Sequence, residues 1–261
     1  MKLVRFELIE QPGLARSGIF HDNRVYETDG DKAVGIHEPS AFHLLSPLGQ
    51  ATAVRVFETV ADGAGERYLT YGYRHPGLVK GPISEIEMAP DVDGLDFDVH
   101  VAAVVSASGM SVEEQEAAGF LLGYTLVIAF NVPAVVEDDQ MRGGSGAPGR
   151  DAGMVMGPFI VTPEEISDYL VAGETDVYAW PFQVRVGEEV VAGGIVEAWP
   201  GFSTLVAQST LVGAVAAGEV LVWPALPKPS LDTSALGRLL LPSDRVTFMV
   251  EGLGTLVAKV G

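Results

Sequence analysis

The sequence contains no cysteine. This excludes disulfide bonds, thiolate nucleophiles, cysteine-ligated zinc and iron–sulfur clusters together, because each of them requires a cysteine sulfur. Other familiar motifs are missing as well: there is no Gly-x-Ser-x-Gly elbow, no phosphate-binding P-loop and no dinucleotide-binding fingerprint followed by an acidic residue. No standard nucleophilic or nucleotide-dependent mechanism can therefore be assigned from a motif.

Basic residues are scarce. Lys and Arg number 16 against 35 Asp and Glu, which gives a formal net charge of -19. A surface this acidic repels both nucleic-acid phosphates and anionic lipid headgroups. We therefore expect neither a nucleic-acid partner nor a membrane partner, and we ascribe the charge mainly to solubility.

The sequence also lacks a hydrophobic run long enough to cross a membrane. Its longest apolar stretch, residues 118–129, is interrupted by Gly123, Tyr124 and Thr125. The opening MKLVRFELIE alternates apolar with polar residues, which is typical of a strand and not of a signal peptide. These features favour a cytoplasmic protein.

The residues that are present indicate a β-rich fold of the α+β class. With 48% hydrophobic residues, a chain of 261 residues can bury a large core, and its 31 glycines and 16 prolines predict many turns. We predict a small N-terminal domain over residues 1–60 and a larger domain over 61–261. Buried strands are predicted at 95–105 and 123–130, whereas 66–90 and 138–151 are interpreted as long loops.

Several strings occur in an order that is typical of one protein family. They are LDFDVHVAAVV at 95–105, GYT at 123–125, GPFIVT at 157–162 and LPSDRVTFMVEGLGTL at 241–256. In identity, order and spacing they resemble the framework of the fumarylacetoacetate hydrolase family. The resemblance implies a mixed β-sandwich roll with a small N-terminal domain, a homodimer, and a small-molecule substrate.

The metal-binding positions of that family have changed. The resemblance implies a Mg²⁺ or Mn²⁺ ion held by a Glu-x-Glu pair and an Asp on the next strand, as hard cations require. Here Asp98 and His100 stand at the pair, and the Asp position falls on Ile128-Ala129. Strand alternation places Asp98 and His100 on one face. We predict that the metal has been lost and that no cofactor is bound; the alternative is a two-ligand site for a softer metal such as zinc.

Other active-site positions of the family are altered too. Asn131 begins the stretch that replaces a Ser-Ala-Arg-Asp string, Arg74 replaces a lysine near the pocket mouth, and Ile195 replaces a threonine. The substrate loop becomes Trp223-Pro-Ala-Leu, while Asp151 keeps an acidic position. The changed positions are concentrated in the active site that the resemblance implies, whereas the framework strings are retained.

These considerations give a set of candidate site residues. The catalytic candidates are His100, Asp98 and Asn131. A histidine near a carboxylate suits general acid–base catalysis, but it also suits a satisfied core position. Asn131 could donate to an enolate or satisfy its own backbone. The substrate-binding candidates are Tyr71, Tyr73, Arg74, Tyr124, Ile128, Ala129, Asp151, Ile195, Trp199 and Trp223.

Three functions are compatible with the sequence. The favoured one is a metal-independent enzyme of secondary metabolism that cyclises or isomerises an unsaturated oxo compound such as a polyketide, a cycloaddition included. This hypothesis is based on the replacement of metal ligands by apolar residues and Trp, which would make a drier cavity for a substrate. The same residues could equally fill the space left by the lost metal ion. The second is a hydrolase or decarboxylase of a β-diketo acid. The third is a non-catalytic binding protein.

Overall fold

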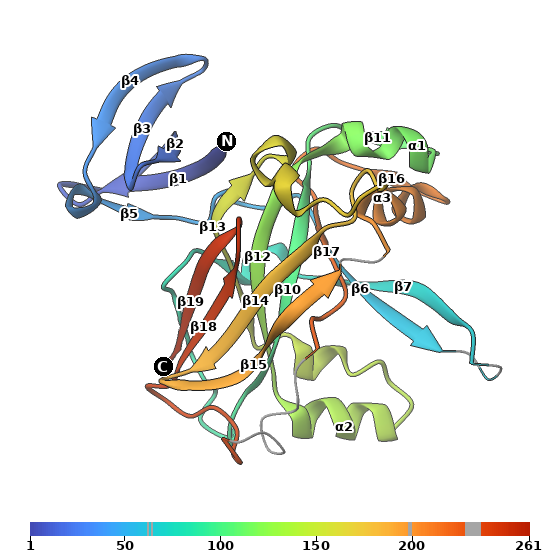
Figure 1. The fold of residues 1–261 in the computed structure, drawn as a ribbon. Helices are drawn as coiled ribbons and strands as arrows, with labels where there is room; N and C mark the ends of the chain where they lie inside the picture. The colour runs from blue at the N-terminus through green and yellow to red at the C-terminus, as the bar shows by residue number, and fades with distance from the viewer. Residues whose placement is uncertain (62, 64, 198–199, 228–235) are drawn as a thin grey trace.

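The computed structural model describes residues 1–61, 63, 65–197, 200–227 and 236–261. Over these residues the chain folds mainly into strands, which form one large and one small sheet (Figure 1). The large sheet contains β1 (Lys2–Leu8), β2 (Gln11–His21), β3 (Arg24–Asp29), β4 (Lys32–His37), β5 (Phe42–Leu44), β6 (Val54–Ala61), β7 (Arg67–Arg74), β8 (Val79–Lys80), β10 (Asp96–Val105), β12 (Leu121–Asn131), β13 (Gly153–Val161) and β17 (Val220–Val222). The β-rich α+β class predicted from the sequence is confirmed.

The small sheet packs against the middle of the large one. It contains β9 (Glu85–Ile86), β14 (Ala179–Val186), β15 (Glu189–Glu197), β18 (Arg245–Val250) and β19 (Gly254–Val260). A further pair is formed by β11 (Gly109–Met110) and β16 (Ala214–Val215). Most pairings are antiparallel, but β6–β17, β8–β13 and β9–β19 are parallel, so both main sheets are mixed.

The helices are short. They are α1 (Glu114–Ala117), α2 (Pro133–Met141) and α3 (Phe202–Thr210), with 3-10 turns at Pro39–Ala41, Pro76–Leu78, Ala118–Phe120, Ala147–Arg150 and Pro163–Tyr169. No helix among the described residues is both long and apolar enough to span a membrane.

The N-terminal strands extend the large sheet beyond the main body. The strand order runs β4-β3-β2-β1-β13-β12-β10-β17-β6-β7, and Figure 1 shows β1 to β4 projecting to one side. β1 is tied to the body through the register Lys2↔Val161 and Leu3↔Ile160. β6 begins within the predicted N-terminal domain of residues 1–60 and crosses its boundary, and its partners β17 and β7 belong to the body.

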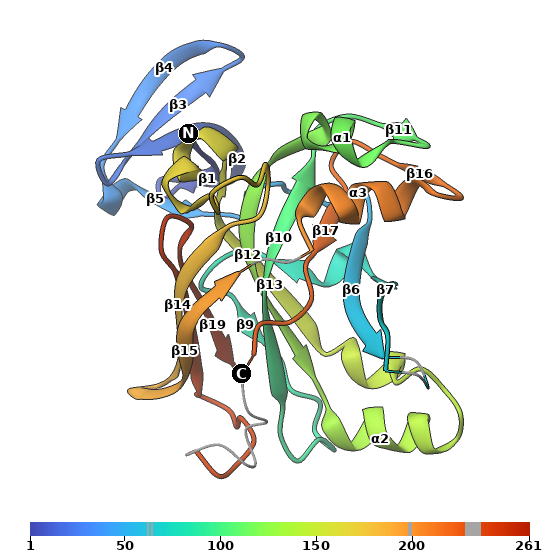
Figure 2. The same ribbon diagram turned by 45° about the vertical axis from the view of Figure 1, so that its right-hand side comes forward.

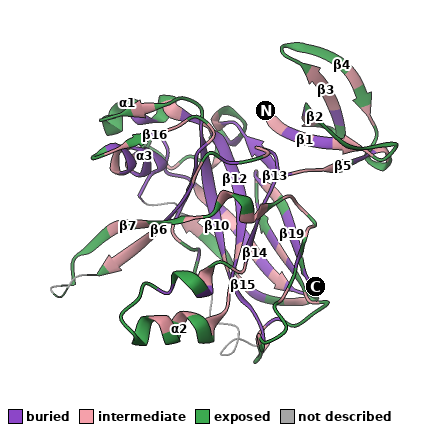
Figure 3. Ribbon diagram, turned by 180° about the vertical axis from the view of Figure 1, so that it is seen from behind, coloured by how far each residue is buried: buried purple, intermediate pink, exposed green. Residues whose placement is uncertain are grey.

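The core lies between the two sheets, where the buried segments concentrate (Figure 3). β10 and β12 are almost wholly buried because their apolar residues face protein on both sides. An aromatic cluster of Tyr124, Tyr178, Trp180 and Phe202 packs at one end of this core, with ring centroids 4.9–6.4 Å apart. The predicted strands at 95–105 and 123–130 are confirmed as β10 and β12.

Two predicted loops were wrong. Residues 66–90 contain β7, β8 and β9, and residues 138–151 begin inside α2. β7 reads RYLTYGYR and is largely exposed, so it shows no apolar alternation. None of the residues of α2 is buried, so α2 carries no apolar stripe that would predict a helix.

Candidate active site

A cavity of about 480 Å³ opens beside the ends of β10 and β12. The β6–β7 hairpin forms one wall and α2 forms another, and Figure 2 shows these two elements flanking the central strands. This volume is within the range of small-molecule sites. The lining residues are Val56, Phe57, Glu58, Arg74, Asp96, Asp98, His100, Ala129, Phe130, Asn131, Pro133, Val136, Glu137, Gln140, Arg150 and Ala225.

β10 supplies three polar side chains to the cavity. Asp96, Asp98 and His100 are spaced by two residues, so strand alternation turns them to the same face. His100 is only 4% exposed, and Asp98 is half-buried. The structure thus brings together the predicted pair Asp98 and His100, and it adds Asp96 to them.

The hydrogen bond of His100 defines its tautomer. Its Nδ1 lies 2.8 Å from the backbone oxygen of Trp223. A carbonyl oxygen can only accept, so Nδ1 carries the proton and Nε2 has a free lone pair in the neutral ring. Burial lowers the pKa of His100, and this effect outweighs the opposing attraction of Asp98. At neutral pH His100 is therefore an uncharged base.

This lowered pKa predicts a stability change on mild acidification. Below pH 6.5, the ordinary pKa of histidine, the imidazole of the unfolded chain binds a proton, whereas buried His100 in the folded chain does so less readily. The free energy of unfolding therefore decreases as the pH decreases. Uptake of one proton on unfolding sets an upper limit of about 1.4 kcal/mol per pH unit on the slope that His100 contributes. Asp98 and Glu58 moderate the effect and Arg74 adds to it. Urea unfolding at pH 7.0, 6.0 and 5.5 measures the slope. His100→Asn should flatten it, and equal slopes for both proteins would contradict the assignment.

The residues at the family's metal positions do not fit a magnesium or manganese ion. Asp98 pairs directly across β10 and β12 with Ala129, so a methyl group stands where the third ligand is needed. His100 offers one nitrogen, and hard cations favour several oxygen ligands. In the part of the chain that the structure describes, no three or more acidic or histidine side chains are grouped to hold a metal ion.

The β6–β7 hairpin turns one basic side chain into the cavity and its tyrosines away. The register pairs Val54 with Arg74 and Arg55 with Tyr73. Alternation therefore places Arg74 on the cavity face. Tyr71 and Tyr73 lie on the other face against the guanidinium of Arg55, at 5.1 and 5.3 Å from its central carbon to their ring centroids.

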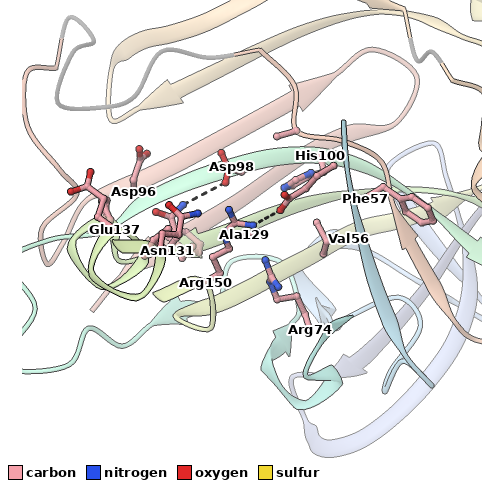
Figure 4. A pocket seen from close by; sticks show the side chains of 16 residues that line it. Val56, Phe57, Arg74, Asp96, Asp98, His100, Ala129, Asn131, Glu137 and Arg150 are labelled. Atoms are coloured by element: carbon pink, nitrogen blue, oxygen red, sulfur yellow. Dashed lines mark hydrogen bonds and ion pairs between the residues drawn. The ribbon is translucent and has the colours of Figure 1, made fainter. Parts of the chain in front are cut away.

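The remaining polar residues divide the cavity into two ends. Arg150, which follows α2, forms an ion pair with Glu58 of β6. Figure 4 shows the guanidinium groups of Arg74 and Arg150 on the side of the cavity nearer His100. Asp96 and Glu137 lie at the opposite end in the same view.

Asn131 lies on this acidic side of the cavity. Its Nδ2 is 3.5 Å from Asp98 Oδ2, which allows at most a weak hydrogen bond. The amide therefore retains its capacity to donate to a bound molecule. Among the predicted candidates, Arg74, Asp98, His100, Ala129 and Asn131 line one cavity.

Other predicted residues lie elsewhere. Tyr124 belongs to the buried aromatic cluster, where burial raises the pKa of its phenol, and Ile128 is fully buried on the opposite face of β12 from Ala129. Asp151 is exposed outside the cavity lining, and Ile195 is 73% exposed on β15. Trp199 lies outside the described residues.

Trp223 contributes to the site only through its backbone. Its indole is buried and donates from Nε1 to the Pro200 oxygen at 2.9 Å, while its own carbonyl fixes His100. Trp223 thus positions the imidazole.

Sequence reasoning missed four charged lining residues: Glu58, Asp96, Glu137 and Arg150. Asp96 could have been predicted, because it continues the alternation of Asp98 and His100 along the strand. Glu58 and Arg150 are 92 positions apart and meet only through the fold. Glu137 was hidden because α2 was not predicted.

The comparison with known families defines the class of this protein. Residues 50–261 match the family profile described as Fumarylacetoacetate (FAA) hydrolase C-terminal. The chain therefore belongs to the fumarylacetoacetate hydrolase family, as the resemblance of its framework strings predicted. No curated protein sequence matches it.

Solved structures extend the likeness over the whole chain. A 5-carboxymethyl-2-hydroxymuconate delta-isomerase from Mycobacterium smegmatis superposes with a TM-score of 0.78 at 20% identity, covering 100% of this chain and 98% of that one. A 2-hydroxyhepta-2,4-diene-1,7-dioate isomerase from Mycobacterium marinum gives 0.77 at 18%, with 100% and 98% covered. A fumarylacetoacetate hydrolase from Exiguobacterium antarcticum gives 0.75 at 20%, with 100% and 99% covered. At these identities the likeness establishes the fold alone.

Proposed function

We propose that this protein is a metal-independent enzyme that isomerises or cyclises an unsaturated oxo acid. The observation that carries the proposal is the buried neutral His100, whose Nε2 lone pair is free beside a cavity of small-molecule size. A base in this state can remove a proton from a carbon next to a carbonyl group. That two structural relatives are named as isomerases of unsaturated diacids supports the same reaction class.

The reaction needs only one proton-transfer group. His100 Nε2 takes a proton from the carbon α to the carbonyl, and the electron pair moves onto the oxygen to give a dienolate. The imidazolium, stabilised by nearby Asp98, returns the proton at the γ carbon, which moves the double bond. The guanidinium groups of Arg74 and Arg150 provide donors for the oxygen, and Asn131 can donate to another polar group of the substrate. Ring closure of a polyketide-like substrate in secondary metabolism could begin from the same dienolate.

Turnover should be insensitive to chelation. We expect 2-oxo-4-enoic monoacids and polyketide-like oxo-dienes to be converted at equal rates with and without excess EDTA, because the cation's role falls to protein groups. A substrate deuterated at the α carbon should carry part of that deuterium to the γ carbon of the product, because the same imidazole removes and returns the proton. Absorbance and NMR measure both results.

Two outcomes would point to the other functions. Turnover that appears only with added Mg²⁺, or products of C–C cleavage by water, would support a hydrolase or decarboxylase instead. Tight binding of these compounds without any product would support a binding protein.

A further inference from the structure

Arg74 is a cation without an ionic partner in a partly buried site. Its Nη1 donates a 3.3 Å hydrogen bond to the backbone oxygen of Tyr73. Among the described residues no carboxylate lies within 4.0 Å of its guanidinium, whereas Arg55 is paired with Glu219 and Arg150 with Glu58. Figure 4 shows the guanidinium of Arg74 directed into the cavity. A buried charge of this kind is usually matched by an opposite one.

Arg150, the second guanidinium of the cavity, repels the positive charge of Arg74. Burial and the like charge of Arg150 lower the pKa of Arg74, and they outweigh the opposing attraction of Asp151, Glu58 and Asp98. Arg150 is half-buried and shares its charge with Glu58. Four carboxylates also line the cavity: Glu58 is paired with Arg150, Asp96 and Glu137 lie at the opposite end, and Asp98 lies beyond ion-pair distance of Arg74. An anion beside Arg74 would give this guanidinium the partner that it lacks among the described residues.

We propose that Arg74, assisted by Arg150, binds the anionic oxygens of the substrate in the place where the resemblance of the sequence implies a divalent cation. Arg74 supplies the positive charge, whereas Arg150 is paired with Glu58 and adds N–H donors. A guanidinium presents parallel N–H donors that match a carboxylate or the two oxygens of a 2-oxo acid enolate. Ala129, which stands at an expected metal-ligand position, lines the same cavity as Arg74. The loss of the metal ligand and the gain of the guanidinium donors therefore occur in one site.

This assignment orients the substrate. Its anionic oxygens lie at the Arg74 end, next to His100, and the remainder extends toward Asp96 and Glu137. Carboxylates repel a second anion and accept hydrogen bonds. The distal part of the substrate therefore carries hydrogen-bond donors, such as hydroxyl or amino groups, in place of a second carboxylate.

Oxalate is a suitable probe because it mimics the planar oxygens of a 2-oxo acid enolate. Titration calorimetry in EDTA should show one oxalate bound per chain, with about tenfold to hundredfold weaker binding in Arg74→Met. Arg74→Lys should recover part of the affinity. Arg67→Met is the matched control, because Arg67 is exposed at the far end of the same strand, and it should leave binding unchanged.

Three results would overturn the assignment: no oxalate binding to the wild-type protein in EDTA, binding that requires added Mg²⁺, or unchanged affinity in Arg74→Met. Thermal unfolding of each variant checks that the fold is intact, and Arg74→Lys keeps the test valid if Arg74→Met fails to fold. The assignment of this anion as the substrate rests on the proposed function. The variant His100→Asn distinguishes a failure of the anion site from a failure of the proposed reaction. His100→Asn should bind oxalate with the wild-type affinity and lose turnover. Oxalate affinity thus reports on Arg74, and turnover reports on His100.

Discussion

Replacing His100 with Asn should lower kcat by about 10²- to 10⁴-fold while KM changes little. The Asn amide can still donate to the Trp223 oxygen that now accepts from Nδ1, so the local fold is preserved. It has no nitrogen that could act like Nε2, so it cannot take the proton. Because the lost interaction belongs to the transition state, the effect falls on kcat. Steady-state kinetics on the converted diene substrate measures it.

The matched control is His43→Asn, since His43 is exposed on β5 in the N-terminal strands. That variant should retain full activity. A His100→Asn enzyme within threefold of the wild type would show that the imidazole is only a core residue and would remove the basis of the proposed reaction.

Arg55→Met should destabilise the protein by about 3–5 kcal/mol, because it leaves the buried Glu219 carboxylate without its cation. Arg55 and Glu219 are 4% and 2% exposed and form an ion pair between β6 and the start of β17. Arg55 also donates to the backbone oxygens of Ser209 and Ala214 at 2.9 and 2.8 Å. One side chain thus holds together the hairpin, the end of α3 and β16. Urea unfolding at pH 7 measures the loss.

Two variants show whether the burial of the pair is responsible. Arg55→Met combined with Glu219→Leu should recover much of the stability, since no buried charge then lacks a partner. Arg142→Met, which breaks the exposed pair with Asp138 on α2, should cost less than about 1 kcal/mol. A loss below 1 kcal/mol for Arg55→Met would contradict this account of the ion pair.

The strands at the centre of the site were predictable because their sequences carry strong signals. LDFDVHVAAVV and GYTLVIAF are apolar, bounded by polar segments, and contain framework strings of the family. The period of two in β10 was sufficient to place Asp98 and His100 on one face. The same rule would have separated Arg74 from Tyr71 and Tyr73 if β7 had been recognised as a strand.

The walls of the cavity could not be predicted in the same way. β7 is exposed and polar, and α2 buries none of its residues, so neither has the apolar period that identifies an element. The Glu58–Arg150 pair depends on the meeting of two such elements. Trp223 illustrates a different limit, because its backbone carbonyl positions His100 and backbone contacts leave no trace in residue identity.

The most direct test of the account is titration calorimetry of the EDTA-stripped protein with Mg²⁺, Mn²⁺ and Zn²⁺. We expect no stoichiometric binding of any of the three ions, because Ala129 faces Asp98 and guanidinium groups share the cavity. Binding of one ion per chain that is lost in both Asp98→Ala and His100→Ala would contradict it. That result would establish a re-liganded metal site and return the protein to the hydrolase and decarboxylase chemistry of its family.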